Sequence, residues 1–206
     1  MLKVKYKIPM LYEYKKYDDS HLCCQSYDNI QPYAIKSAIL SAIIQLEGIE
    51  KAQELFYKIK NSNIYISKSN VQDVNSFRTL LYTNRHYSGE SVGVQTTGAR
   101  EKINLDEIVF YIDNLIPNLE VYLKNIDYFG TSDSFVYLDS IEEVNTMEYV
   151  YTKWNDEIDV ETYTIKDWSS KTTFESIYLF SPKRKHNHIS YIGKLEKKVS
   201  LWFIGN

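Results

Sequence analysis

Cysteine, proline and glycine are scarce in this chain of 206 residues, which contains two, four and seven of them. The two cysteines, Cys23 and Cys24, are adjacent, and a disulfide between neighbouring residues is strained. We therefore expect free thiols and a reducing, cytoplasmic setting. The C-x-x-C spacing of a zinc site is also missing and no second cysteine pair follows, so we expect neither a metal nor another cofactor.

Long hydrophobic runs and nucleotide-binding motifs are missing as well. The longest apolar run, residues 38–46, is interrupted by Ser41 and Gln45 and is far too short to span a bilayer. Nothing resembles a signal peptide, so we expect no membrane partner. No Walker loop, G-x-S-x-G or G-x-G-x-x-G motif occurs, and the sequence gives no support to the enzyme classes that carry them.

The charges are unevenly distributed. The formal net charge is −3, which argues against a free-standing nucleic-acid binder. Residues 101–161 contain fifteen acidic and three basic residues, a net charge of −12, so the remainder of the chain carries +9. This asymmetry predicts one face for a polyanion and another for a different partner, while an ordinary mixed surface stays an equally open interpretation.

The predicted elements follow the order strand, helix, strand, strand, helix, strand. Residues 2–8 alternate apolar residues with lysine, as a half-buried strand does, and apolar residues recur at helical spacing from Ile35 to Leu46. Gly48 breaks this helix before a further helical piece. The remaining predictions are strands at 63–67, 108–112 and 135–139 and a helix at 114–126. The sequence therefore predicts an α+β fold with a ferredoxin-like (RRM-like) βαββαβ domain over residues 1–145.

Two regions lie outside that pattern. Residues 68–102 are polar, contain three glycines and show no sustained periodicity, which predicts a long inserted loop that is either functional or disordered. From residue 146 to residue 206 we expect a small β-rich appendage. Its predicted strands are Met147–Trp154, Asp159–Ile165, Ile177–Phe180 and Val199–Ile204.

Three segments carry a family resemblance. Residues 31–43, QPYAIKSAILSAI, resemble the Cas-five pattern of a proline-led turn followed by Ser or Thr and a helix of small and aliphatic residues. Residues 99–102, AREK, are similar to that family's REK or REY before an apolar strand. Residues 125–136, NIDYFGTSDSFV, resemble its I-x-x-[FL]-G-x-x-x-S-[FL]-V turn. The three segments occur in the family's order within about residues 1–140.

The resemblance implies a non-catalytic RNA-binding subunit of the CRISPR-associated RAMP superfamily. In a type I, Cascade-like surveillance complex of antiviral defence, such a subunit caps the 5′ handle of the guide RNA (crRNA). The partners implied are a Cas-seven-type backbone subunit and the large subunit that reads the protospacer-adjacent motif (PAM), with target DNA near that motif a further possibility. The insertion at 68–102 corresponds to the family's thumb.

Single-stranded RNA is bound by aromatic and guanidinium planes that stack on bases and by cations that pair with phosphates. Groups of these kinds stand in the insertion, at the start of the first helix and in the glycine-containing turn. The candidate RNA-binding residues are Arg78, Arg85, His86, Tyr87, Arg100, Lys102, Lys36, Ser37, Gly130, Thr131, Ser132 and Ser134. A flexible surface loop, a solvated first helical turn and a plain helix-to-strand turn are the respective alternatives. Asp133 stands where many relatives carry a basic residue, which disfavours phosphate binding at the turn.

Three further interpretations are open. Arg85-His86-Tyr87 contains residue types that metal-independent guide-processing endoribonucleases use, but Glu47–Glu50 lacks the tyrosine that these enzymes place after the first helix. An unrelated ferredoxin-like protein with no RNA preference is the second. The basic stretch 182–198 either follows the path of RNA or target DNA or forms a solvated loop.

Overall fold

The computed structural model describes residues 1–14, 23–27, 29–67, 71–87, 90–113, 115–130, 134–147, 162–177 and 189–196. The elements in chain order are β1 (Leu2–Lys7), β2 (Cys23–Cys24), α1 (Pro32–Glu47), α2 (Ile49–Asn61), β3 (Ile64–Ile66), β4 (Val71–Tyr87), β5 (Glu90–Leu105), β6 (Glu107–Ile112), α3 (Leu119–Lys124), β7 (Tyr137–Glu143), β8 (Thr162–Trp168), α4 (Phe174–Ile177) and β9 (Ile189–Glu196). The prediction of a mixed helix-and-strand protein is confirmed, and its main sheet is antiparallel.

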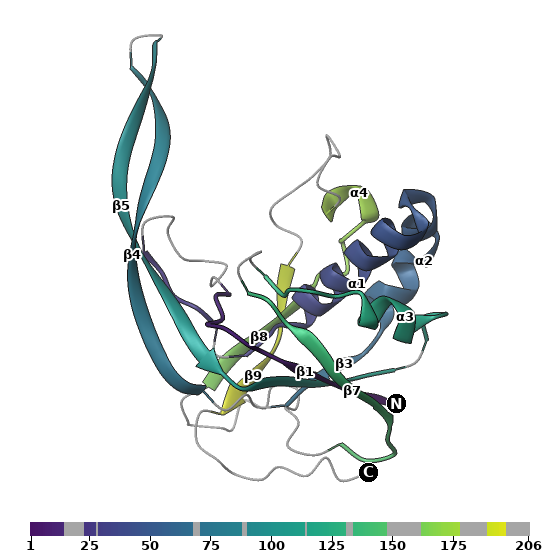
Figure 1. Cartoon of the computed structure of the whole chain (residues 1–206). Helices are drawn as coiled ribbons and strands as arrows, with labels where there is room; N and C mark the ends of the chain where they lie inside the picture. The colour runs from purple at the N-terminus through teal and green to yellow at the C-terminus, as the bar shows by residue number, and fades with distance from the viewer. Residues whose placement is uncertain are drawn as a thin grey trace.

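Strand β1 lies in the middle of a four-stranded sheet with the order β3-β6-β1-β7 (Figure 1). It pairs antiparallel with β6 on one side and β7 on the other, and β3 pairs antiparallel with β6. The side chains of Leu2, Val4 and Tyr6 are buried, whereas the three lysines between them are half-buried. Because successive side chains of a strand point to opposite faces, this alternation decides which face of the sheet carries the core.

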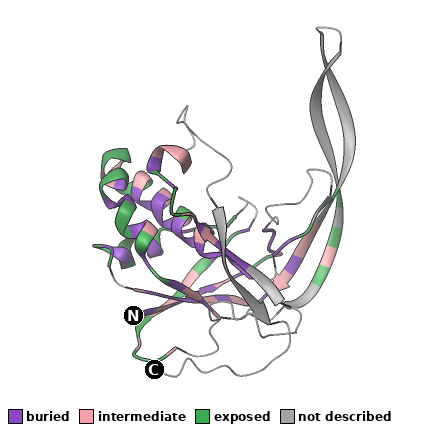
Figure 2. Cartoon of the chain, turned by 180° about the vertical axis from the view of Figure 1, so that it is seen from behind, coloured by how far each residue is buried: buried purple, intermediate pink, exposed green. Residues whose placement is uncertain are grey.

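Helices α1, α2 and α3 lie over one face of the sheet, where most buried residues gather (Figures 1 and 2). The hydroxyl of Tyr6 donates a hydrogen bond of 2.6 Å to the carbonyl oxygen of Leu123, and its ring lies 5.1 Å from that of Phe129 in an edge-to-face arrangement. Each large apolar side chain buried in this layer contributes about 1.5–3 kcal/mol. The hydrogen bond and the ring contacts fix α3 and the segment after it against the sheet.

The predicted helix and its break at Gly48 are confirmed. Helix α1 ends at Glu47 and α2 begins at Ile49, and between them Gly48 has a φ of 91°. Residues with a Cβ seldom adopt such a backbone, so glycine is the residue that lets the two helices follow one another with a single residue between them. Their apolar faces both pack on the sheet.

Residues 68–102 were expected to form a loop, and that expectation is wrong for most of them. Strands β4 and β5 pair antiparallel along their lengths, from Val71 opposite Leu105 to Tyr87 opposite Glu90. This hairpin leaves the body of the molecule as a long two-stranded arm (Figure 1). Because the arm extends away from the body, no core imposes on its sequence the alternation that identifies most strands. The absence of proline and the many β-branched and aromatic residues were the available signal.

The base of the arm is attached to the segment between β1 and α1. Tyr12 and Ile103 exchange two backbone hydrogen bonds of 2.8 Å, and β2 pairs in parallel with β5. The Ser26 hydroxyl donates to the carbonyl oxygen of Glu101 at 2.6 Å and accepts from the backbone N–H of Tyr14 at 3.3 Å. These bonds determine where the arm leaves the body.

Two predicted elements have different bounds in the structure. The helix expected at 114–126 is limited to α3, because Asn118 has a left-handed φ of 56° and the helix begins only after it. The strand expected at 135–139 is β7, which begins later and extends to Glu143. Pro117 indicated the region in which the helix begins, but the first helical residue is Leu119.

The C-terminal region contributes a separate antiparallel pair, β8 with β9, and β8 packs beside α1. The buried Trp168 has its ring 5.5 Å from that of Phe56 on α2. The strand predicted at 177–180 is wrong at its first residue, since Ile177 ends the short helix α4. The stretch 189–196, interpreted as part of a basic loop, is strand β9. The predicted strand at 199–204, and that at 147–154 beyond Met147, lie outside the described residues.

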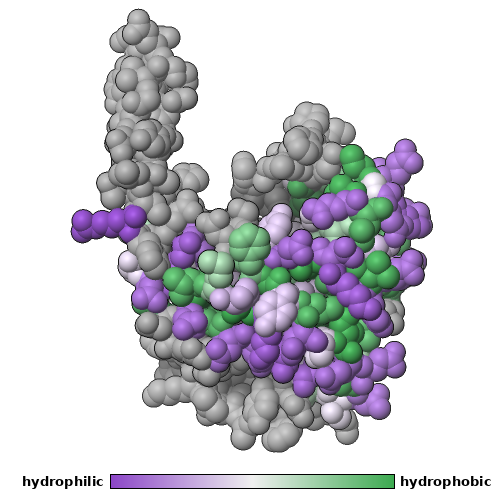
Figure 3. All heavy atoms as spheres, viewed as in Figure 1, coloured by the Kyte–Doolittle hydropathy of each residue, from purple (hydrophilic) through white to green (hydrophobic). Residues whose placement is uncertain are grey.

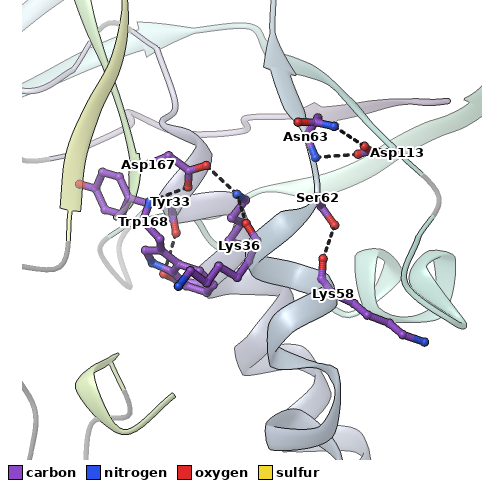
Figure 4. A network of polar contacts seen from close by, with 10 residues as sticks. Tyr33, Lys36, Lys58, Ser62, Asn63, Asp113, Asp167 and Trp168 are labelled. Carbon is purple, nitrogen blue, oxygen red and sulfur yellow. Dashed lines mark hydrogen bonds and ion pairs between the residues drawn. The ribbon is translucent and has the colours of Figure 1, made fainter. Parts of the chain in front are cut away.

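A buried ion pair attaches β8 to α1 (Figure 4). The Lys36 ammonium donates to Oδ2 of Asp167 at 2.6 Å and to the carbonyl oxygen of Lys60 at 2.8 Å, and only 2% of Lys36 is exposed. Burial raises the pKa of the Asp167 carboxyl, and the Lys36 ammonium acts in the opposite direction. The backbone N–H of Trp168 also donates to this carboxylate at 2.7 Å.

Replacing Lys36 by Met should destabilise the fold by about 3–5 kcal/mol, because it leaves the Asp167 carboxylate buried without its counter-charge. The change is measured as a shift of the urea unfolding midpoint at neutral pH, and it should shrink at acidic pH, where protonation neutralises the carboxyl. Lys51→Met is the control, since Lys51 forms a surface pair with Glu54 at 2.9 Å and should cost at most about 1 kcal/mol. Equal midpoints for the two variants would contradict the structural role of Lys36.

A candidate ligand groove beside the hairpin

A groove of about 310 Å³ lies between α1 and the turn that follows α3. Its residues come from three parts of the chain: the segment after β1, the exposed side of α1, and the turn at 125–130. They are Tyr14, Tyr33, Ala34, Ser37, Ala38, Ser41, Ala42, Gln45, Asn125, Ile126, Asp127, Tyr128 and Gly130. In Figure 3 the face that carries α1, α3 and β7 shows apolar and weakly polar side chains between the base of the arm and more hydrophilic groups.

Helix α1 forms one wall of the groove with small side chains. Ala34, Ala38 and Ala42 recur every four residues, which places them in one row along the helix. Ser37 and Ser41 border this row, and the Ser37 hydroxyl donates to the carbonyl oxygen of Tyr33 at 2.7 Å. Larger side chains in this row would fill the groove, so its width depends on these alanines.

The turn at 125–130 forms the opposite wall and packs closely on Tyr14. Gly130 has a φ of 82°, and a Cβ there would overlap Cδ2 of the Tyr14 ring and lie 3.1 Å from its Cε2. The turn is closed by an antiparallel bridge between Tyr128 and Phe135 and by a hydrogen bond of 2.8 Å from the N–H of Val136 to the carbonyl oxygen of Asp127. Glycine is thus required at this position both by the backbone and by the neighbouring ring.

Tyr14, which lines the groove, is the centre of a cluster of tyrosines. The ring of Tyr14 lies 5.5 Å from that of Tyr27, 6.0 Å from that of Tyr33 and 6.2 Å from that of Tyr12. Burial, followed by the neighbouring Tyr33, raises the pKa of Tyr12 and of Tyr14 well above the ordinary value. Both hydroxyls therefore stay protonated at any physiological pH, as hydrogen-bonding groups without charge.

Two of the predicted RNA-binding residues, Ser37 and Gly130, lie in this groove on opposite walls. The sequence placed them in separate motifs, and the fold brings them together. Thr131 and Ser132, predicted beside Gly130, lie outside the described residues.

Two other predicted residues, Lys36 and Ser134, make hydrogen bonds within the protein instead of facing a ligand. Lys36 was predicted to bind an anion at the start of α1, but its ammonium is buried against Asp167 and the carbonyl of Lys60. Ser134 was predicted to help the turn hold a phosphate or a base edge, but it is fully buried. Its hydroxyl donates to the carbonyl of Glu13 at 2.7 Å and accepts from the N–H of Glu13 at 2.9 Å. We correct both assignments because neither group can reach a ligand without breaking these bonds.

The predicted residues of the arm form two groups, one around Arg78, Arg100 and Lys102 and the other at Arg85–Tyr87. Arg78 is exposed near the base, opposite Ala99 in the ladder. Lys102 is opposite Asn75, so the period of two places it on the other face of the arm from Arg78, with its ammonium 3.9 Å from the Glu13 carboxylate. Arg85, His86 and Tyr87 end β4, and Arg100 lies in β5 opposite Phe77. The side chains of those four residues lie outside the described part of the structure.

The groove also contains residues that sequence reasoning did not single out, among them Tyr14, Tyr33 and Tyr128. Nineteen tyrosines are spread along the chain, so a tyrosine as such carries no signal. The spacing of Ala34, Ala38 and Ala42 was visible in the sequence, but alanines on a helix are as often packed against a core. Only the fold shows that this row borders a groove.

The face of the sheet opposite the helices is the obvious alternative site, and its charges are balanced. The ammonium of Lys7 lies 2.8 Å and that of Lys5 3.4 Å from the Glu107 carboxylate. The hydrogen bond from Lys7 is the main reason that the pKa of Glu107 is lowered and that of Lys7 is raised. Tyr111, on the same face, is only 1% exposed. Lys5 and Lys7 are therefore already paired with a carboxylate, while Tyr137, opposite Lys7, is 55% exposed.

The part of the chain that the structure describes contains neither a metal-ligand cluster nor a membrane-spanning helix. No group of three or more histidine, cysteine, aspartate or glutamate side chains there is arranged to hold a metal ion. None of the helices described is both long enough and apolar enough to cross a lipid bilayer.

The chain is similar over most of its length to a protein named CRISPR-associated protein Cas5, from Archaeoglobus fulgidus. The two are 25% identical over 200 residues, which span 90% of this chain and 87% of the relative. The resemblance to the Cas-five family that was drawn from three sequence motifs is thus confirmed. No protein-family profile matches the chain.

Two solved structures resemble parts of the fold. One is described as the crystal structure of a CRISPR protein from Archaeoglobus fulgidus, with 13% identity, a TM-score of 0.43 and coverage of 68% of this chain and 62% of that one. The other is a chain of a Type III-B Cmr-beta complex bound to cognate target RNA, with 16% identity, a TM-score of 0.42 and coverage of 68% and 59%. This chain thus covers less than two thirds of either solved chain.

The close contact between Gly130 and Tyr14 can be tested by a double-mutant cycle. Gly130→Ala should destabilise the protein, and Tyr14→Ala in the same chain should relieve part of that loss, with a coupling energy of at least about 1 kcal/mol. Gly48→Ala is the matched control, because its φ is also positive but nothing lies within 4 Å of the added Cβ. Unfolding midpoints of the four chains in each cycle measure the coupling. Equal coupling of Tyr14 to both glycines would show that the groove wall is not formed by this contact.

Proposed function

We propose that this chain is an RNA-binding subunit of a type I, Cascade-like CRISPR surveillance complex and that it caps the 5′ handle of the crRNA. The Cas5-named relative, similar over 90% of this chain, supports a CRISPR RNA-associated role. The handle and the type of complex are inferred from the motif resemblance at residues 31–43, 99–102 and 125–136.

We further propose that the main sheet with its helices is a ferredoxin-like core, as in RRM domains. The chain passes through β1, the pair α1 and α2, β3, β6, α3 and β7 in that order, with the arm inserted between β3 and β6. The antiparallel order β3-β6-β1-β7 supports this assignment, because it follows from two right-handed β-α-β crossovers that interleave. The arm then corresponds to the thumb of the family.

The observation that carries the proposal is the position of the groove at the base of the arm. Ser26 bonds both to Glu101 at the base of β5 and to Tyr14 in the wall of the groove. A strand of RNA that lies along the arm therefore reaches a row of small residues and tyrosines within the same rigid unit. Exposed Arg78 supplies a cation near this junction, and aromatic walls suit unpaired bases.

The sheet face is not proposed as the RNA platform, although RRM domains use theirs. Lys5 and Lys7 are already paired with the Glu107 carboxylate, and Tyr111 is covered. Binding RNA there requires that these ion pairs be broken without any net gain in positive charge. The groove and the arm require no such rearrangement of the residues described.

The partners proposed are a Cas-seven-type backbone subunit and the large subunit, with target DNA near the PAM as a further contact. The acidic region 101–161 is proposed to meet a protein rather than nucleic acid, and within it Glu142 and Glu143 of β7 are exposed. Strand β7 is an edge of the main sheet in the described structure, so both acids are accessible to a docking protein. Co-purification of two such subunits with the chain tests this assignment.

Removing the arginine near the base of the arm should weaken RNA binding. We expect Arg78→Ala to bind a fluorescein-labelled single-stranded RNA of mixed sequence more weakly and to reduce the slope of log K against log salt by about 0.7, the value for one lost phosphate contact. Fluorescence anisotropy at several salt concentrations measures both quantities. Lys58→Ala, which removes an exposed cation from α2, is the control and should leave the slope unchanged. An unchanged slope for Arg78→Ala would place the RNA elsewhere.

We also propose that the chain does not cleave RNA itself. Incubation with precursor guide RNA without metal should give no new ends, and His86→Ala should leave RNA retention largely unchanged. Denaturing gel electrophoresis of the RNA checks the first result, and anisotropy checks the second. Cleavage by the wild-type chain that His86→Ala abolishes would make it a guide-processing endoribonuclease instead.

A further inference from the structure

Among the residues that the structure describes, the lining of the groove contains an acidic side chain and no basic one. Asp127 is the acid, and no lysine, arginine or histidine is among those lining residues. Lys36, the basic residue next to Ser37, is turned inward to Asp167 and leaves the groove without its charge. A phosphate placed here would meet the Asp127 carboxylate without a counter-ion among the described residues.

The same groove is well supplied with neutral groups. The alanine row gives a flat apolar wall, while Ser41, Gln45 and Asn125 add polar side chains with hydrogen-bonding capacity. Tyr128 is 41% exposed and presents an aromatic ring at the rim. A flat, uncharged group with donors and acceptors on its edge matches such walls. The volume of the groove falls at the lower end of the range of about 300–1,000 Å³ that is usual for small-ligand sites.

One buried hydroxyl points independently to a ligand. Among the residues that the structure describes, the hydroxyls of Tyr12 and Tyr14 make no hydrogen bond of standard geometry, although both are shielded from solvent. The side chain of Tyr33 is the polar neighbour of Tyr14 and contributes to raising its pKa. Buried polar groups are nearly always satisfied, so an unpaired hydroxyl is exceptional. Tyr14 is the one of the two that lines the groove. A ligand with an acceptor or donor at this position would satisfy it.

We propose that this groove is a nucleobase site that excludes phosphate. The inference deepens the proposed function and rests on it, since it assigns the base of an unpaired nucleotide to the groove and the phosphates of the same strand to the arm. The Asp127 carboxylate accepts a hydrogen bond, so the site favours bases with an exocyclic amino group over uracil. The turn thus recognises a base, where the motif alone suggested a phosphate or a base edge.

Binding of free nucleosides and nucleotides distinguishes recognition of a base from recognition of a phosphate. The full chain is titrated with adenosine, uridine, adenosine 5′-monophosphate and ribose 5-phosphate, and binding is followed by saturation-transfer difference NMR. Adenosine should bind at least about fivefold more tightly than its monophosphate, because two like charges about 4 Å apart repel to that extent even in bulk water. Ribose 5-phosphate should not bind, and the preference for adenosine over its monophosphate should decrease as salt screens the repulsion.

Variants locate the binding in the groove. Asp127→Asn should bring the affinities for adenosine and its monophosphate together, whereas Glu142→Gln, which neutralises an exposed acid on β7, should leave their ratio unchanged. Ala38→Leu fills the alanine row and should abolish adenosine binding. Gln53→Leu, an exposed change on α2, is its control, and Ser41→Leu repeats the test at a second groove position in case Ala38→Leu does not fold.

The outcomes distinguish the groove from the proposed function. Tighter binding of the monophosphate than of adenosine, or a ratio that Asp127→Asn does not change, overturns the inference. If adenosine does not bind while Arg78-dependent RNA binding persists, the inference is also overturned. The proposed RNA-binding function then remains intact, and the groove is assigned to a protein side chain instead. Groove-dependent adenosine binding by a chain that retains no RNA would instead overturn the proposed function.

Discussion

The alternation of apolar residues and lysine in β1 is the constraint on which the rest of the structure depends. Leu2, Val4 and Tyr6 face the helices, so a slip of one residue in the pairing of β1 would bury the three lysines. Because β1 is the central strand, its register also fixes β6 and β7 on its two sides. The positions of the arm, which enters through β6, and of the turn, which precedes β7, follow from that register.

The groove shows how segments distant in sequence become one site. Tyr14 follows β1, the alanine row lies on α1, and Gly130 comes after α3. Ser134 joins the first of these segments to the last through two hydrogen bonds to Glu13, so the residue predicted to bind phosphate instead holds the wall of the groove. Lys36 has a comparable structural role in α1, where its ion pair with Asp167 holds β8. Both are needed for the site without touching its ligand.

Periodic burial in the sequence was sufficient to predict the strands of the main sheet and the helices that cover it. Residues 2–8, the helix that breaks at Gly48 and the strand at 108–112 each show the period of two or 3.6 that a core imposes. The arm was predicted as a loop because it leaves the core and loses that period. Lys36 and Ser134 were misassigned because their residue types fit an anion site equally well, and only long-range contacts, to Asp167 and Glu13, reveal their roles. The tyrosines of the groove carry no local signal, and the spacing of its alanines does not distinguish a groove wall from a packed helix face.

On the sheet face Lys5 and Lys7 are paired with Glu107, and we propose that the groove and the arm bind single-stranded RNA instead. This central claim is tested most directly by recovering the tagged chain from its native host and sequencing the RNA that accompanies it. The account predicts short RNAs of uniform length that share one 5′ handle, together with further CRISPR-associated subunits. Recovery of the intact chain without RNA and without such subunits would contradict it.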